Sequence, residues 1–182
     1  MTWAEILYRK KMKVELHPFN KDWKNLFDIE KDLLSSTIQN SDIQIEHIGS
    51  TAIEGLSAKP IIDILIGVPD FSKANDFIAP IKTCNYTYIS VYEDTMPYRR
   101  FFTKSTENKR THQIHMVELN YPFWIRHLAF RNYLREHQEE KEAYNLIKSE
   151  LSEKDWDDIN DYAEAKTEFI RAIEYKAGIR EW

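Results

Sequence analysis

Residues 45–64 read IEHIGSTAIEGLSAKPIIDI and place a glycine-containing turn between two apolar stretches. Gly49 follows a predicted strand and has no Cβ, so the backbone there can approach a ligand closely. Ser50 or Thr51 can cap a short helix, whose first N–H groups would face an anion such as a phosphate. Lys59 and the proline after it then force an extended entry into a second strand. The stretch therefore predicts two strands joined by a turn suited to phosphate.

Asp63 lies inside that second strand, which is otherwise apolar from residue 61 to residue 68. An unpaired buried charge is costly, so this carboxylate needs a cation, a basic partner or a cleft. Strand alternation places Asp63 and Leu65 on one face and Ile62 and Ile64 on the other. We therefore expect the isoleucines to face the core and Asp63 to face the side where the turn presents its amides.

The remainder of the chain alternates between helical and strand periodicity. Helices are predicted over 21–38, around 74–81 and over 158–176, and Ala143, Leu146 and Ile147 share one face of a further helix. The predicted strands are 43–48, 61–68, 86–91, 98–103 and 113–119. These elements predict an α/β (α+β) fold with a small mixed sheet flanked by helices. Residues 1–120 form this core, and residues 121–182 form a helical part packed on it in one compact domain.

Composition excludes several classes of protein. The chain has 182 residues, with 25 Lys and Arg against 30 Asp and Glu and a net charge of −5, which argues against binding nucleic acid through bulk charge. The single Cys84 excludes an intrachain disulfide and a Cys-rich zinc site, and it fits a reducing compartment. No apolar stretch is long enough to span a bilayer, and the first residues lack the pattern of a secretory signal. We expect a cytoplasmic protein without a membrane partner.

Two further groups of residues are candidates for chemistry. In the predicted strand near residue 113, Gln113 and His115 share a face, whereas His112 lies on the other. A neutral His115 could bind a metal ion or act as a general base, and the alternative is a hydrogen-bonded structural histidine. Arg99 and Arg100 could neutralise phosphates from a neighbouring hairpin, and the alternative there is a solvated hairpin.

These stretches resemble the GrpB family, whose fold is similar to that of nucleotidyltransferases. The resemblance is carried by residues 46–52, 55–56, 59–64, 127–135 and 166–170. It implies that Gly49 and Ser50 hold nucleotide phosphates, and that two acidic residues, two positions apart on the next strand, hold Mg²⁺ or Mn²⁺. Asp63 matches the first acidic position, but Leu65 stands at the second, and a leucine cannot bind metal.

Three functions are open on this basis. The first is metal-dependent transfer of a nucleotidyl group, with catalytic and metal-binding roles for Asp63 and His115, an acceptor-orienting role for Glu46 and a further metal ligand in His112. Its phosphate-binding residues would be Gly49, Ser50, Thr51, Lys59, Arg99 and Arg100. The second, motivated by Leu65, is a module that binds a nucleotide or phosphorylated small molecule without turnover. The third is a metal hydrolase built on His47, His112 and His115.

Overall fold

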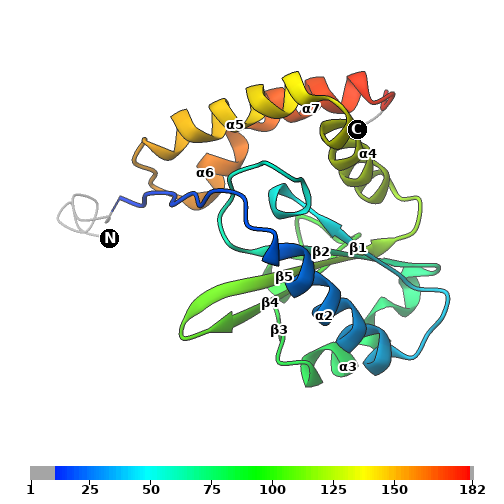
Figure 1. The fold of residues 1–182 in the computed structure, drawn as a ribbon. Helices are drawn as coiled ribbons and strands as arrows, with labels where there is room; N and C mark the ends of the chain where they lie inside the picture. The colour runs from blue at the N-terminus through cyan, green and yellow to red at the C-terminus, as the bar shows by residue number, and fades with distance from the viewer. Residues whose placement is uncertain (1–10, 181–182) are drawn as a thin grey trace.

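The computed structural model describes residues 11–180 and contains a five-stranded sheet with helices on both faces (Figure 1). The strand order is β1-β2-β5-β4-β3, and β2 pairs in parallel with β5 while the other neighbours are antiparallel. The strands are β1 (Gln44–Ile48), β2 (Ile62–Val68), β3 (Thr87–Tyr88), β4 (Arg100–Thr106) and β5 (Lys109–Glu118). The expected mixed sheet and α/β fold are confirmed. The chain start, from which we expect no secretory signal, lies outside the described residues.

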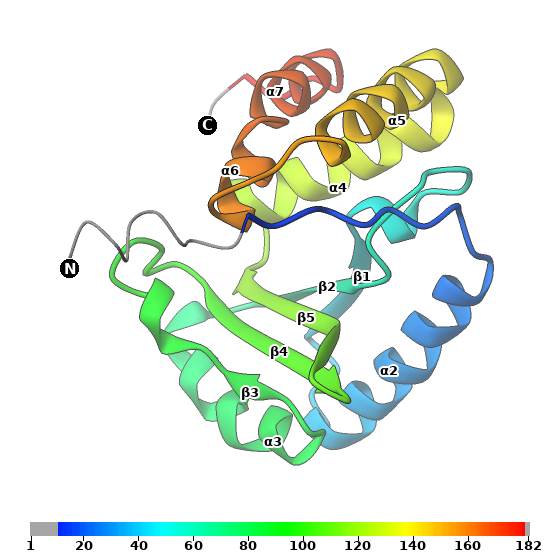
Figure 2. The ribbon, with the colours of Figure 1, turned by 90° about the vertical axis from the view of Figure 1, so that its left-hand side faces the viewer.

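The helices form two layers, one on each side of the sheet (Figure 2). Helices α2 (Asp22–Ile38) and α3 (Ile78–Thr83) cover one face. The other face carries α4 (Pro122–Glu136), α5 (Gln138–Ser152), α6 (Ile159–Glu164) and α7 (Thr167–Lys176). Short 3-10 turns are η1 (Ser50–Ala52), η2 (Phe71–Phe77) and η3 (Ser90–Tyr92). No helix in the described part of the chain is long and apolar enough to cross a membrane.

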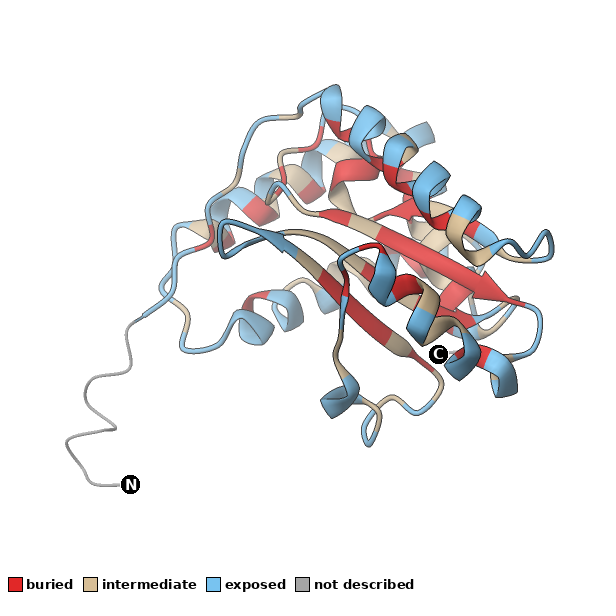
Figure 3. Ribbon diagram, turned by 90° about the horizontal axis from the view of Figure 1, so that it is seen from below, coloured by how far each residue is buried: buried red, intermediate tan, exposed pale blue. Residues whose placement is uncertain are grey.

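Strand β2 is buried on both faces, because each face packs against a different helical layer. Ile62, Ile64 and Ile66 lie in the main apolar core beneath α2 and α3. On the opposite face Leu65 packs with Val117 in a smaller apolar cluster at the base of α4. Burial follows the strands and the inner sides of the helices (Figure 3). The alternation predicted for β2 is therefore confirmed, and Leu65 is fully enclosed as well.

Two predictions about the C-terminal helices are wrong. The helix predicted over 158–176 is divided into α6 and α7, and Lys166 lies at the junction between them. In α5 the buried residues are Tyr144, Lys148 and Leu151, whereas Leu146 is 61% exposed. The buried face of α5 includes Lys148, so a prediction from apolar spacing alone places the buried face on the wrong side of the helix.

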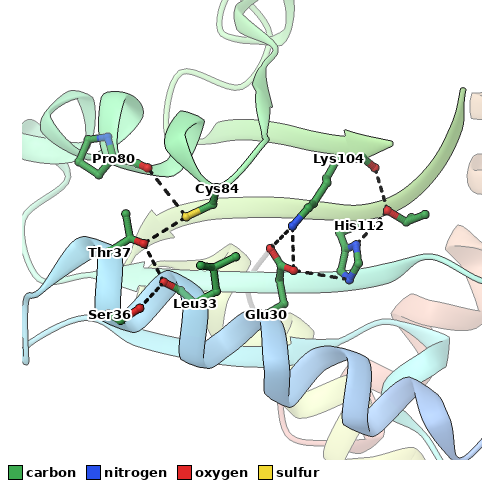
Figure 4. A network of polar contacts seen from close by, with 9 residues as sticks. Glu30, Leu33, Ser36, Thr37, Pro80, Cys84, Lys104 and His112 are labelled. Atoms are coloured by element: carbon green, nitrogen blue, oxygen red, sulfur yellow. Dashed lines mark hydrogen bonds and ion pairs between the residues drawn. The ribbon is translucent and has the colours of Figure 1, made fainter. Parts of the chain in front are cut away.

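Glu30 of α2 lies beneath the sheet at 5% exposure and forms the centre of a polar network (Figure 4). Lys104 Nζ of β4 donates to its two carboxylate oxygens at 2.8 and 3.0 Å. His112 Nε2 of β5 lies 4.0 Å from Glu30 Oε2. The network ties α2 to the two central antiparallel strands, and each buried charge has an opposite charge beside it.

Breaking this ion pair from one side should destabilise the protein. Glu30→Gln leaves Lys104 without its counter-charge, and we expect a loss of about 2–3 kcal/mol in the free energy of unfolding, measured with urea. The double variant Glu30→Gln/Lys104→Met should recover most of this loss, because both charges are gone. Asp28→Asn on the same helix removes an exposed pair with Lys24 and should cost less than about 0.5 kcal/mol. A loss for Glu30→Gln as small as that for Asp28→Asn would contradict the prediction.

Candidate functional site

The Asp63 carboxylate packs directly against the turn that precedes its strand. Gly49 has φ +70°, and a Cβ built at this position would come within 2.9 Å of Asp63 Cγ. Any side chain at residue 49 would therefore collide with the carboxylate, in a backbone conformation that already favours glycine. Gln113 of β5 donates a hydrogen bond from its amide nitrogen to Asp63 Oδ1. Residues 49, 63 and 113 thus meet at one point on the face of the sheet toward α4.

Three lysines from separate segments surround this region: the charges of Lys59 and Lys166 act on Asp63, and Lys148 repels Lys166. Lys59 precedes β2, Lys148 lies on α5 and Lys166 joins α6 to α7. Lys148 is 2% exposed and donates to the Ser57 carbonyl oxygen. Within residues 11–180 none of the three forms an ion pair with a carboxylate. We call Asp63, Gln113, Lys59, Lys148 and Lys166 the Asp63 cluster.

Burial shifts the pKa values of these groups toward their neutral forms. It raises the pKa of Asp63 to about 6, although the hydrogen bond from Gln113 and the charge of Lys59 act in the opposite direction. Burial lowers the pKa of Lys166 to about 7, with added repulsion from Lys59 and Lys148. The pKa of Lys148 also falls to about 7 through burial alone. A bound anion would favour the charged lysines and offset this cost.

Two tyrosines complete the surroundings of the cluster. Tyr144 of α5 is buried, and its hydroxyl interacts with the Ser50 side chain. Lys166 Nζ lies 3.5 Å from the centre of the Tyr162 ring, and Lys59 Nζ lies 5.5 Å from it. A cation held over an aromatic face keeps its hydrogen-bond donors available. Ser50, Tyr144 and the lysines therefore offer donors that can be directed at an anion.

The turn itself differs from the expected helix cap. Residues Ser50–Ala52 form a 3-10 turn whose cap position is Gly49, without a side-chain cap. Thr51 does not face the Asp63 cluster, because its hydroxyl donates to the Ile61 carbonyl oxygen at 3.2 Å and contacts His47 Nε2 at 3.0 Å. Thr51 therefore stabilises the turn internally, and Ser50 interacts instead with Tyr144.

Glu46 is held away from Asp63. Arg131 Nη1 of α4 donates to Glu46 Oε2 at 2.6 Å and to the His47 carbonyl oxygen at 2.8 Å. Glu46 pairs with Leu65 in the β1–β2 register, whereas Asp63 pairs with Ile48. The structure thus gives Glu46 a partner in Arg131 and does not bring it to the Asp63 carboxylate.

Arg99 and His115 lie together on the same face of the sheet as Asp63. Arg99 Nη1 donates to His115 Nδ1 at 3.2 Å, and the guanidinium lies 4.9 Å from the centre of the Phe101 ring. Burial and the charge of Arg99 hold the pKa of His115 well below its usual value, so His115 is a neutral acceptor. Arg99 is 9% exposed and has no carboxylate partner among residues 11–180. This second uncompensated charge lies beside His115, which shares the Gln113 face of β5.

His112 and Arg100 lie on the opposite face of the sheet. His112 contacts Glu30 beneath α2, and Arg100 Nε donates to Asn75 Oδ1 at 2.8 Å. Alternation along β5 separates His112 from His115, so His112 cannot share a metal ion with Asp63. The histidines proposed for a hydrolase are likewise divided, since His47 stacks on Phe27 of α2.

The residues present fit at most one divalent metal ion. In the described part of the chain no three His, Cys, Asp or Glu side chains gather as a possible metal site. Asp63 offers one carboxylate, the Nδ1 atom of His115 is engaged by Arg99, and Leu65 is buried in an apolar cluster. Mg²⁺ needs several oxygen ligands, so phosphate oxygens and water would have to supply the others.

Comparison with known proteins agrees with this α/β architecture. The family model described as GrpB protein matches residues 13–176, and the chain belongs to the GrpB family. It is 40% identical over 171 residues to UPF0157 protein YqkA of Bacillus subtilis, covering 94% of this chain and 49% of that protein. The chain thus spans about half the length of this relative.

Two further relatives match along nearly their full length. Glutamate-rich protein GrpB of Alkalihalophilus pseudofirmus is 36% identical over 165 residues, covering 90% of this chain and 95% of that protein. The crystal structure of conserved protein GrpB from Enterococcus faecalis superposes with a TM-score of 0.79 at 33% identity, covering 90% of this chain and 96% of that one. The arrangement of sheet and helices is thus shared with an experimentally determined relative.

Sequence reasoning missed Lys148 and Lys166 as site residues. Tyr144, Lys148 and Leu151 are spaced by four and three positions, which is the spacing of one helix face. A lysine at the spacing of a buried helix face indicates that this face contacts a polar site. Lys166 begins the stretch 166–170 that resembles the GrpB family, but periodicity gives it no such signal, because its position depends on the break between α6 and α7.

The elevated pKa of Asp63 predicts a specific dependence of stability on pH. The folded protein holds this proton up to about pH 6, whereas the unfolded chain releases it near pH 4, so wild type should lose stability relative to Asp63→Asn as pH rises between about 4 and 6. Carboxyl ¹³C NMR should show the shift directly. Asp70, an exposed helix cap whose pKa is lowered by hydrogen bonds from Ser72, is the internal control. Titration of both carboxyls below pH 4 would refute the assignment.

Proposed function

We propose that the Asp63 cluster binds a phosphate group of a nucleotide or a phosphorylated small molecule. The observation that carries this proposal is the distribution of paired and unpaired cations. Two buried cations elsewhere have carboxylate partners, since Lys104 pairs with Glu30 and Arg131 pairs with Glu46. Near Asp63 the charges of Lys59 and Lys166 act on one carboxylate, and Lys148 adds a further cation that repels Lys166, so an anionic ligand would complete the balance of charge.

A phosphate suits these donors because of its charge and its several acceptor oxygens. Ammonium groups donate charge-assisted hydrogen bonds to phosphate, and Ser50 can add a neutral one. Gly49 lets the Asp63 carboxylate pack against the turn, and Asp63 could hold one divalent ion together with the phosphate. A divalent ion bound at Asp63 would neutralise part of the charge of the phosphate. The lysines can neutralise much of that charge in the absence of the ion.

Binding is favoured over two-metal nucleotidyl transfer by the environment of Leu65. This residue stands where the fold family implies a second acidic ligand, and it packs with Val117, Phe123 and Trp124. A carboxylate placed in that apolar cluster would be costly to ionise. The Asp63 cluster is therefore suited to recognition of the ligand more than to two-metal transfer.

Substitution of the lysines tests the proposal. In titration calorimetry with ATP at pH 7 without metal, Lys59→Gln/Lys166→Gln should weaken binding at least about tenfold, since each removes a charge-assisted hydrogen bond. The control Lys82→Gln/Lys154→Gln makes the same charge change at exposed positions and should bind as wild type does. Equal affinity in the cluster variant and the control, across ATP, GTP and coenzyme A, would refute the proposal.

Asp63→Asn separates metal-free from metal-assisted binding. Without metal this variant should bind ATP more tightly than wild type, because a negative charge beside the phosphate is removed. If Asp63 holds a metal ion, added Mn²⁺ should tighten binding to wild type and have a much smaller effect on the variant. Weaker metal-free binding by Asp63→Asn would show that the carboxylate supports the ligand in another way and would contradict the charge argument.

Binding should also depend on pH through the lysines. Because the pKa values of Lys148 and Lys166 are about 7 in the free protein, metal-free affinity for ATP should fall as pH rises from about 7 to 9. The charge of ATP changes little in this range, so the fall reports the protein. Lys59→Gln/Lys166→Gln should flatten the profile, and an unchanged slope in that variant would contradict the assignment.

A further inference from the structure

A cavity of about 550 Å³ lies at the open edge of β1. Strand β1 has a neighbour on only one side, and the cavity is bounded there by α2, the 49–56 turn, α4 and α5. None of Lys59, Asp63, Lys148 and Lys166 lines it. The volume is in the range of pockets that hold small organic molecules. The cavity is therefore a site apart from the Asp63 cluster, on the other side of the glycine-containing turn.

The charged residues around the cavity leave an excess of positive charge. Five cations and three carboxylates line it, but Lys24 pairs with Asp28 at 2.5 Å and Arg131 pairs with Glu46 at 2.6 Å. This leaves three cations, from Lys31, Arg135 and Lys141, against the single carboxylate of Glu54. Neither Lys31 nor Lys141 forms an ion pair with any described carboxylate.

Arg135 has hydrogen-bond donors to spare. Its Nε and Nη2 atoms donate to the Ala52 carbonyl oxygen at 3.1 and 2.7 Å, which fixes the guanidinium against the turn. A guanidinium has five N–H groups, so three remain after these two bonds. The nearby charge of Arg131 adds to the burial that lowers the pKa of Arg135, so the two guanidinium groups repel each other. An anion at this wall of the cavity would relieve that repulsion.

The rest of the lining is apolar and aromatic. Phe19, Phe27, Ile45 and Ala52 line the cavity, and the His47 ring stacks on Phe27 with centres 4.7 Å apart. Burial and the two nearby arginines lower the pKa of His47 to about 3, so this ring is neutral. One wall of the cavity is therefore suited to an aromatic or aliphatic part of a ligand, and another wall is suited to a negatively charged group of that ligand.

We propose that the cavity between α2, β1 and α4 is a second binding site, specific for a small organic anion that joins an apolar body to a carboxylate or phosphate head group. The head group is bound by Arg135, Lys31 and Lys141, and the body packs against Phe19 and Phe27. This site does not depend on the function proposed for the Asp63 cluster, since the two share no binding residue.

The test uses phenyl phosphate and benzoate as probes, with neutral benzyl alcohol as the control ligand. Titrations are followed by ¹H–¹⁵N NMR on the full chain carrying Lys59→Gln/Lys166→Gln, which weakens anion binding at the other site. We expect saturable shifts of amides in the cavity wall, such as those of Lys31, Glu54 and Lys141, with at least one anionic probe. The tighter of the two anions identifies the head group.

Adding Lys31→Gln/Lys141→Gln should weaken binding of the anion at least about tenfold, because two of its three cations are lost. The matched control Lys82→Gln/Lys109→Gln removes two exposed lysines elsewhere and should leave affinity unchanged. The proposal is overturned if neither anion gives saturable shifts at the cavity, if benzyl alcohol binds there as tightly as the anions, or if the Lys31/Lys141 variant binds as the control does.

Discussion

The burial of one carboxylate against a glycine turn is the constraint on which the arrangement around β2 depends. Asp63 is on a strand whose other face is entirely core, so its side chain must be accommodated toward α4. Gly49 makes the necessary space, and Gln113 supplies a hydrogen bond. Because burial still opposes the negative charge, Lys59 before β2 and Lys166 at the α6–α7 junction act in the stabilising direction. The Asp63 cluster is thus formed by residues of the sheet together with residues of the C-terminal helices.

Paired and unpaired charges divide this molecule into structural and candidate functional regions. The Glu30–Lys104 and Glu46–Arg131 pairs are locally balanced, and they join α2 and α4 to the sheet. Among the described residues, cations without carboxylate partners lie in the Asp63 cluster, at Arg99 and along the cavity beside β1. Buried charges without such partners are costly, which supports the proposals that anionic ligands bind there.

The turn between residues 45 and 64 contributes residues to both candidate sites, the Asp63 cluster on one side and the cavity beside β1 on the other. Ser50 contacts Tyr144 on the side of the Asp63 cluster, whereas Thr51 bonds within the motif and Ala52 accepts hydrogen bonds from Arg135. The turn is therefore held by both helices, α4 and α5.

The sequence by itself determined the faces of the central strands, because alternation along 61–68 and 111–118 depends only on local geometry, whereas the order β1-β2-β5-β4-β3 came from the tertiary structure. It also identified Gly49, Ser50, Lys59 and Asp63, which are close together along the chain. Only the tertiary structure decided that Lys148 and Lys166 join them, that Glu46 and Thr51 are engaged elsewhere, and that His112 lies beneath the sheet. Those outcomes depend on which distant side chain neutralises which buried charge, and local periodicity carries no information about such long-range pairing.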